Sequence, residues 1–144
     1  MKILDVTIPD IPDTTSEICH ELTIRYSLAY VGRNADLDFS RDSNKFTEYL
    51  KKCQSTDKAP GRVATLWGDV DKVLLHSMIV GPDDTQWIGS NNLNSFGIPG
   101  NRKVVDVSQY LRGTDRIQTK SNGILYLKYY EPEYVAGYIE TGLL

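Results

Sequence analysis

The sequence predicts a mainly antiparallel β-sandwich or jelly roll, formed by residues 1–144 as a single domain. From Leu22 to Tyr30, residues alternate between apolar and polar, which is the period of a half-buried strand. Further along, Asn122-Gly123 separates two strand-like runs. Such a pair favours a two-residue hairpin turn, because both central residues need a positive φ. Together these patterns indicate strands joined by tight turns.

One short helix is expected near residues 43–53. Asp42 or Ser43 can cap its N-terminus, since a short polar side chain accepts a hydrogen bond from the first free N–H groups. Apolar residues then recur at helical spacing up to Cys53.

The N-terminal third contributes three predicted strands and an arm. Residues 3–8 alternate as a first strand that Pro9 ends, and residues 9–20 form an extended arm or linker with two closely spaced prolines. The strand at 22–30 turns at residues 32–34 and returns as a strand over 35–39.

The remaining strands follow the helix. We expect strands at 63–67, at 73–80 as a central strand, and at 87–88, followed by a long polar loop from Ser90 to Arg102. After a short strand containing Val105 and Val107, residues 106–112 read as one helical turn that Gly113 closes. The hairpin strands cover 116–120 and 124–130, and residues 132–144 form a C-terminal tail.

The segment from Asp106 to Ile117 resembles a known family. Its Asp-Val-Ser, Tyr-Leu and Gly-x-Asp-x-Ile pattern is similar to the "D-V-[ST]-x-x-L-x-x-G-x-N-x-I" segment of galactose-binding-like jelly rolls, with Asp115 in place of the usual Asn. The family includes discoidin-like lectins and carbohydrate-binding modules. The resemblance implies a β-sandwich, and it suggests carbohydrate as a ligand.

Composition narrows the class of protein. The net charge of −3 and the pI near 5.3 argue against a general nucleic-acid binder, which needs a basic face. Two cysteines are too few for a disulfide scaffold, so we expect both to be reduced and packed. We also expect no signal peptide, no membrane span and synthesis in a cytoplasm.

No catalytic pattern emerges from the sequence. His20 and His76 are isolated, and His76 in an apolar strand is expected to be a hydrogen-bonded core or partner-facing residue. A glycine-rich phosphate loop and a nucleophile elbow are missing, and we expect no enzyme activity and no cofactor. Asp36-x-Asp38 and Asp69-x-Asp71 offer too few oxygens for calcium, so no metal site is predicted.

Two candidate binding surfaces remain. The loop can bind sugar hydroxyls through its amides and Arg102, with an aromatic ring stacking on a pyranose, although the same loop can simply pack on the domain. The chain has nine tyrosines, and five of them, between 126 and 138, gather near the C-terminus, which favours a protein interface formed by the tail. The candidate ligand residues are Trp87, Asn91, Asn92, Asn94, Phe96 and Arg102, and the candidate assembly residues are Tyr130, Tyr134, Tyr138, Ile139, Leu143 and Leu144.

These features predict a non-catalytic structural protein that assembles with copies of itself. Its most concrete form is a phage virion component, such as a head decoration, ring, connector or tail protein, with other virion proteins as partners. The alternative is a carbohydrate-binding module, either free or mounted on a virion.

Overall fold

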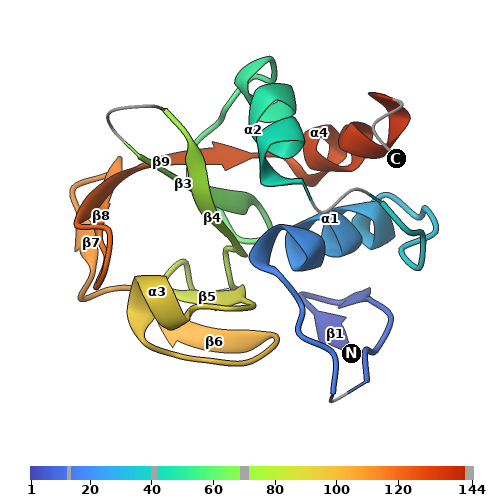
Figure 1. Ribbon diagram of the computed structural model, residues 1–144, viewed down its shortest axis with the longest axis horizontal. Coiled ribbons are helices and arrows are strands. Elements are labelled where there is room, and N and C mark those ends of the chain that lie inside the picture. The colour runs from blue at the N-terminus through green and yellow to red at the C-terminus, as the bar shows by residue number, and fades with distance from the viewer. Residues whose placement is uncertain (13, 40–41, 69–71, 142–144) are drawn as a thin grey trace.

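A computed structural model describes residues 1–12, 14–39, 42–68 and 72–141. It confirms a mainly antiparallel β fold. One curled sheet of seven strands forms one side of the molecule, and the longer helices lie together on the other side (Figure 1). In spatial order the strands are β6 (Lys103–Asp106), β5 (Gln86–Gly89), β4 (Leu74–Ile79), β3 (Val63–Trp67), β9 (Ile124–Tyr130), β8 (Arg116–Gln118) and β7 (Leu111–Arg112).

The first predicted strand is instead a small hairpin. Strands β1 (Lys2–Ile3) and β2 (Val6–Thr7) pair with each other, because Leu4 and Asp5 both adopt positive φ and turn the chain. Ile3 and Ile8 from this hairpin are buried against α1 and the sheet.

The predicted strand at 22–30 is wrong, since these residues belong to helix α1 (Cys19–Tyr30). The helix packs against β4 and β5 on one side and against β2 and α4 on others. It is therefore buried almost all round, and no apolar stripe of helical period marks it in the sequence. The return strand predicted at 35–39 is also wrong, because this segment is a turn and an irregular stretch.

The predicted short helix is confirmed as α2 (Ser43–Lys51). Asp42 is its N-cap, and its side chain accepts a hydrogen bond from the N–H of Asn44 at 2.9 Å. After the sheet, α4 (Pro132–Ala136) and the 3-10 helix η1 (Gly137–Thr141) return to the same side as α1 and α2. The core between these helices and the sheet includes Ile24, Leu28, Phe46, Leu50, Val63, Trp67, Leu74, Tyr130, Val135, Tyr138 and Ile139.

A second core fills the inside of the curl. Trp87 is fully buried there and packs edge-on against Tyr129, with 6.1 Å between the ring centroids. The short helix α3 (Leu93–Phe96) closes this space, since the loop between β8 and β9 donates backbone hydrogen bonds to Asn94 and Ser95.

The β8–β9 hairpin is confirmed, but its turn differs from the predicted type. Gln118 pairs with Ile124, so the loop spans five residues, and only Gly123 adopts positive φ. Thr119 closes the loop by donating its hydroxyl hydrogen to the carbonyl of Gly123 at 2.7 Å. The helical turn predicted for 106–112 is confirmed in part. The N–H groups of Tyr110 and Leu111 both donate to the carbonyl of Val107, as in one turn of helix, but the two ends of the stretch belong to β6 and β7.

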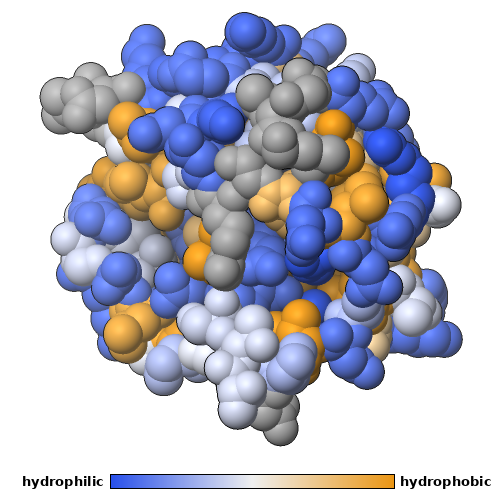
Figure 2. Space-filling model, turned by 45° about the vertical axis from the view of Figure 1, so that its right-hand side comes forward, coloured by the Kyte–Doolittle hydropathy of each residue, from blue (hydrophilic) through white to orange (hydrophobic). Residues whose placement is uncertain are grey.

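The face drawn in Figure 2 is mostly hydrophilic where it is coloured. On the face drawn in Figure 2, apolar residues form separate patches among polar ones. None of the helices in the described part of the chain has the length and apolar character needed to cross a membrane.

Candidate active site

A cysteine lies at the N-terminal end of α1. Cys19 is the first residue of this 12-residue helix. The backbone N–H of Ile18, just before it, donates to the carboxylate of Glu21 at 3.4 Å and so stabilises the first turn. Aligned peptide dipoles create a positive potential at this end of a helix, which stabilises an anion such as a thiolate. The position of Cys19 therefore suits a nucleophile.

Polar groups from α1 and β4 surround the thiol. Its Sγ lies 3.6 Å from Nδ1 of His20. Burial raises the pKa of the Cys19 thiol to about 11, although the backbone N–H groups of Ser77, His20 and Cys19 itself act in the opposite direction. The thiol is therefore protonated at neutral pH, and a base is needed to produce the thiolate.

His76 on β4 has the hydrogen bonds of an oriented base. Its Nε2 lies 2.7 Å from Oδ1 of Asn92, whose Nδ2 donates to the carbonyl of Gly89 at 3.0 Å. Because a carbonyl can only accept, this bond fixes which end of the Asn92 amide faces the histidine. Oδ1 must then accept from His76, so the hydrogen is on Nε2 and Nδ1 is left with a lone pair.

This pair lies in the interior. His76 is 2% exposed and Asn92 is fully buried. Burial lowers the pKa of His76 to about 4, and the hydrogen bond to Asn92 opposes this only in part. At neutral pH the imidazole is uncharged, which is the form that can take a proton.

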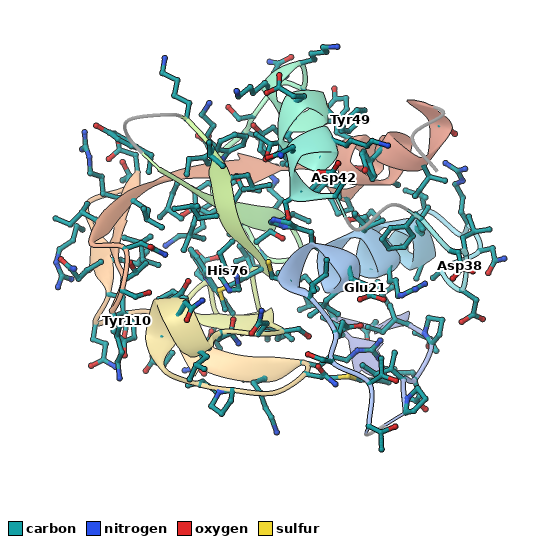
Figure 3. The ribbon with its side chains drawn as sticks, viewed as in Figure 1. Glu21, Asp38, Asp42, Tyr49, His76 and Tyr110 are labelled. Atoms are coloured by element: carbon teal, nitrogen blue, oxygen red, sulfur yellow. The ribbon has the colours of Figure 1, made fainter. Side chains whose placement is uncertain are left out.

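Cys19 and His76 lie on α1 and β4, two elements that pack against each other. One of the N–H groups that act on the thiol belongs to Ser77, the next residue after His76, and His76 contributes to lowering the pKa of His20. Figure 3 shows His76 where β4 passes the N-terminal end of α1. The thiol and the His76 imidazole are not hydrogen-bonded to each other, and contacts of this kind often tighten only when a substrate binds.

His20 belongs to a second buried set of hydrogen bonds. Its Nδ1 lies 2.8 Å from Oγ of Ser77, which lies 2.9 Å from Oγ1 of Thr23. Thr23 in turn donates to the backbone carbonyl of His20 at 3.1 Å. Burial lowers the pKa of His20 to about 3, and the nearby His76 lowers it further, so this imidazole is also neutral.

A buried ion pair holds the chain just before Cys19. The carboxylate of Glu17 accepts from Arg102 at 3.0 Å and from the hydroxyl of Ser90 at 2.6 Å. The side chain of Asn101 accepts from the N–H of Glu17 and donates to the carbonyl of Thr15. These bonds fix the arm that precedes Cys19 to the loop that carries Asn92.

Most residues of the predicted sugar site are not available to a ligand. Trp87, Asn92 and Phe96 are buried in the core, so neither ring is free to stack on a sugar. Arg102 is engaged with Glu17, and only Asn91 and Asn94 of the predicted set are exposed.

The predicted assembly residues are also largely internal. Tyr130, Tyr138 and Ile139 are buried in the core of the chain itself, whereas Tyr134 is 46% exposed. Leu143 and Leu144 lie outside the described residues. Among the described members of this set, Tyr134 is therefore the side chain that is available to a partner.

The acidic pairs remain unsupported as metal ligands. Asp36 and Asp38 are exposed, and Asp69 and Asp71 lie outside the described residues. In the described ranges, no three His, Cys, Asp or Glu side chains come together as they would around a metal ion. Both cysteines are free thiols.

The candidate site around Cys19 was not predicted from the sequence. His20 and His76 look isolated along the chain, whereas in the fold His76 is near enough to lower the pKa of His20. The sequence pattern predicted a strand at 22–30, so a helix beginning at Cys19 was not expected. One available signal was the combination of a cysteine with a histidine and an asparagine elsewhere in the chain.

Comparisons with protein-family models, with curated proteins and with solved structures give no match. The case for a function therefore rests on the geometry of the site.

Proposed function

We propose that the protein is a cysteine-dependent hydrolase or acyltransferase, with Cys19 as the nucleophile, His76 as the general base and Asn92 as the residue that orients His76. The observation that supports the proposal is the His76–Asn92 hydrogen bond of 2.7 Å on β4, the strand that packs against the helix whose N-terminus carries the thiol. A thiol, an imidazole and a carboxamide form a catalytic set that recurs on unrelated folds. This role departs from the non-catalytic one that the sequence predicts.

The chemistry follows from the positions of the hydrogens. Nδ1 of His76 takes the proton from Sγ of Cys19 as the sulfur attacks the carbonyl carbon of an ester or amide. The bond to the leaving group breaks, the leaving group receives the proton from Nδ1, and a thioester remains on Cys19. Water, deprotonated by Nδ1, or another acceptor then releases the acyl group and restores the thiol.

Asn92 keeps the imidazole in the productive form throughout. Its Oδ1 accepts from Nε2–H of His76, so Nδ1 remains the nitrogen that exchanges a proton. The backbone N–H groups of Cys19, His20 and Ser77 act on the sulfur and stabilise negative charge there.

Acylation by p-nitrophenyl acetate tests the proposal. In a Cys53→Ser background, we expect a burst of p-nitrophenolate and an acetyl group on Cys19, located by mass spectrometry of peptides. Cys19→Ser should abolish the burst, and His76→Ala should abolish it while leaving Cys19 present. Acylation that persists in either variant, or that never occurs on Cys19, would overturn the proposal.

The earlier hypotheses stay predictions. A jelly-roll topology, self-assembly as a virion component and carbohydrate binding each need an independent test. Mass measurement in solution at several concentrations tests assembly, and a glycan array tests sugar binding. Because Trp87 and Phe96 are buried, neither ring is free to stack on a sugar, and this weakens the carbohydrate-binding hypothesis.

A further inference from the structure

We infer that His20 is a positioning residue whose Nδ1–H donates a hydrogen bond to the Cys19 thiolate, with its tautomer fixed by Ser77 and Thr23. The inference rests on the proposed reactivity of Cys19, and it assigns to the second histidine of the cluster a role different from that of His76.

The direction of each hydrogen bond can be worked out from Thr23. Its hydroxyl lies 3.1 Å from the backbone carbonyl of His20, which can only accept, so the single hydroxyl hydrogen of Thr23 is used there. The contact of 2.9 Å between the hydroxyls of Thr23 and Ser77 therefore needs the hydrogen of Ser77.

The hydrogen on His20 follows from the same count. With its own hydrogen given to Thr23, Oγ of Ser77 can only accept across the 2.8 Å contact with Nδ1 of His20. Nδ1 must then carry the hydrogen of the neutral imidazole. The chain Thr23, Ser77 and His20 thus fixes the Nδ1–H tautomer.

This hydrogen also faces the nucleophile. Sγ of Cys19 lies 3.6 Å from the same Nδ1, so the thiolate becomes a second acceptor as soon as it forms. A hydrogen bond to an anion is about twice as strong as one between neutral groups. The interaction therefore grows as negative charge develops on the sulfur.

The two histidines thus have opposite hydrogen positions. His76 is protonated on Nε2 and offers a bare Nδ1, whereas His20 is protonated on Nδ1 and is unable to take a proton there. Among the described residues, His20 from α1 lies 3.6 Å from the thiol, and His76 from β4 lowers the pKa of His20. One accepts the proton of Cys19, and the other stabilises the anion that remains.

Alkylation by iodoacetamide tests this role, because only the thiolate reacts. In the Cys53→Ser background, the rate at Cys19 should rise about tenfold per pH unit below the pKa of the thiol. His20→Leu removes the donor and should displace this profile upward by about one pH unit, which means about tenfold slower alkylation at a fixed pH. His20→Asn places an amide N–H near the position of Nδ1 and should restore most of the rate.

A purely structural role predicts a different result. His20→Leu and His20→Asn would then change the melting temperature but leave the pH profile where it is, and that outcome would overturn the inference. If His20→Leu does not fold, the ¹⁵N shifts of the unmutated protein decide. Nδ1 of His20 and Nε2 of His76 should each carry the hydrogen, and the reverse tautomer at His20 would refute the argument.

The outcomes also separate this inference from the proposed function. A shifted alkylation profile without any acylation by p-nitrophenyl acetate would retain the role of His20 and reject the hydrolase. If acylation requires His76 but the alkylation profile is not shifted in His20→Leu, the hydrolase proposal is retained and the role of His20 is rejected.

Discussion

Glu17 and Arg102 form an ion pair inside the protein, 3.0 Å apart, with side-chain exposures of 0% and 6%. Arg102 also donates to the carbonyl of Pro9 at 2.7 Å, so the pair joins the N-terminal arm to the loop after β5 at two points. The two residues are far apart in the sequence, yet they hold the segments that carry Cys19 and Asn92.

Breaking this pair should be costly. Arg102→Met leaves the carboxylate of Glu17 buried without its cation, and we expect a loss of about 3–5 kcal/mol in the free energy of unfolding, measured with denaturant. Arg33→Met is a matched control, since Arg33 pairs with Glu140 at the surface, and it should cost about 1 kcal/mol or less. Equal losses in the two variants would contradict the importance of the buried pair.

Stability should fall as the pH is lowered from neutral. The pKa values of His20 and His76 are lowered to about 3 and about 4, from 6.5, so the unfolded chain binds protons at a pH where the folded chain does not. The stabilisation is complete above pH 6.5 and is lost progressively as the pH falls from 6.5 to about 4 for His76 and to about 3 for His20.

The matched variant is His76→Gln, in which the side chain no longer titrates. The melting temperature of the unmutated protein should decrease more steeply between pH 6.5 and 4 than that of His76→Gln. Identical slopes would mean that the pKa of His76 is not lowered by folding.

The β8–β9 loop offers a test of backbone strain. Gly123 has a φ of 68° with open space around its Cα, so Gly123→Val should destabilise the protein through strain alone, by about 1–3 kcal/mol. Asn122 has no positive φ, and Asn122→Val should change the stability by less than about 0.5 kcal/mol. Equal effects in thermal melts would point to a turn in which both residues adopt positive φ.

The C-terminal segment should behave as part of the core. Val135→Ala removes fully buried methyl groups and should cost about 2 kcal/mol, whereas the neighbouring Tyr134→Ala, at a site 46% exposed, should cost much less. Deleting 132–144 should prevent folding, as judged by circular dichroism. A deletion variant that folds and stays soluble would instead support the prediction that this segment is an assembly arm.

The parts of the fold that the sequence predicted well have local causes. Helix α2 has an N-cap and a one-sided apolar face, and strand β3 is a short apolar run bounded by glycines at 61 and 68. Helix α1 was missed because its buried positions include Leu22, Thr23, Ile24 and Ser27 on several sides. The segment is helical because of its contacts with the sheet, with α4 and with the N-terminal hairpin. Such long-range contacts are not visible in a sequence pattern.

The candidate active site was missed for a related reason. Asn92 and His76 were each noticed, one as a sugar ligand and the other as a core residue, and both lie in the interior. Their partnership depends on the return of the chain after β5, which brings the two side chains within 2.7 Å. Spacing along the sequence does not show such a contact, because it arises from tertiary packing.

The place of β9 in the sheet has a consequence for the order of folding. This strand lies between β3 and β8, and its residues 126–130 pair with residues 63–67. During synthesis β3 therefore lacks one of its two neighbours until residues 124–130 have also left the ribosome. Such distant pairing is slow to form. Until it forms, one edge of β3 stays open to pairing with other chains, so newly made molecules are the ones most exposed to aggregation.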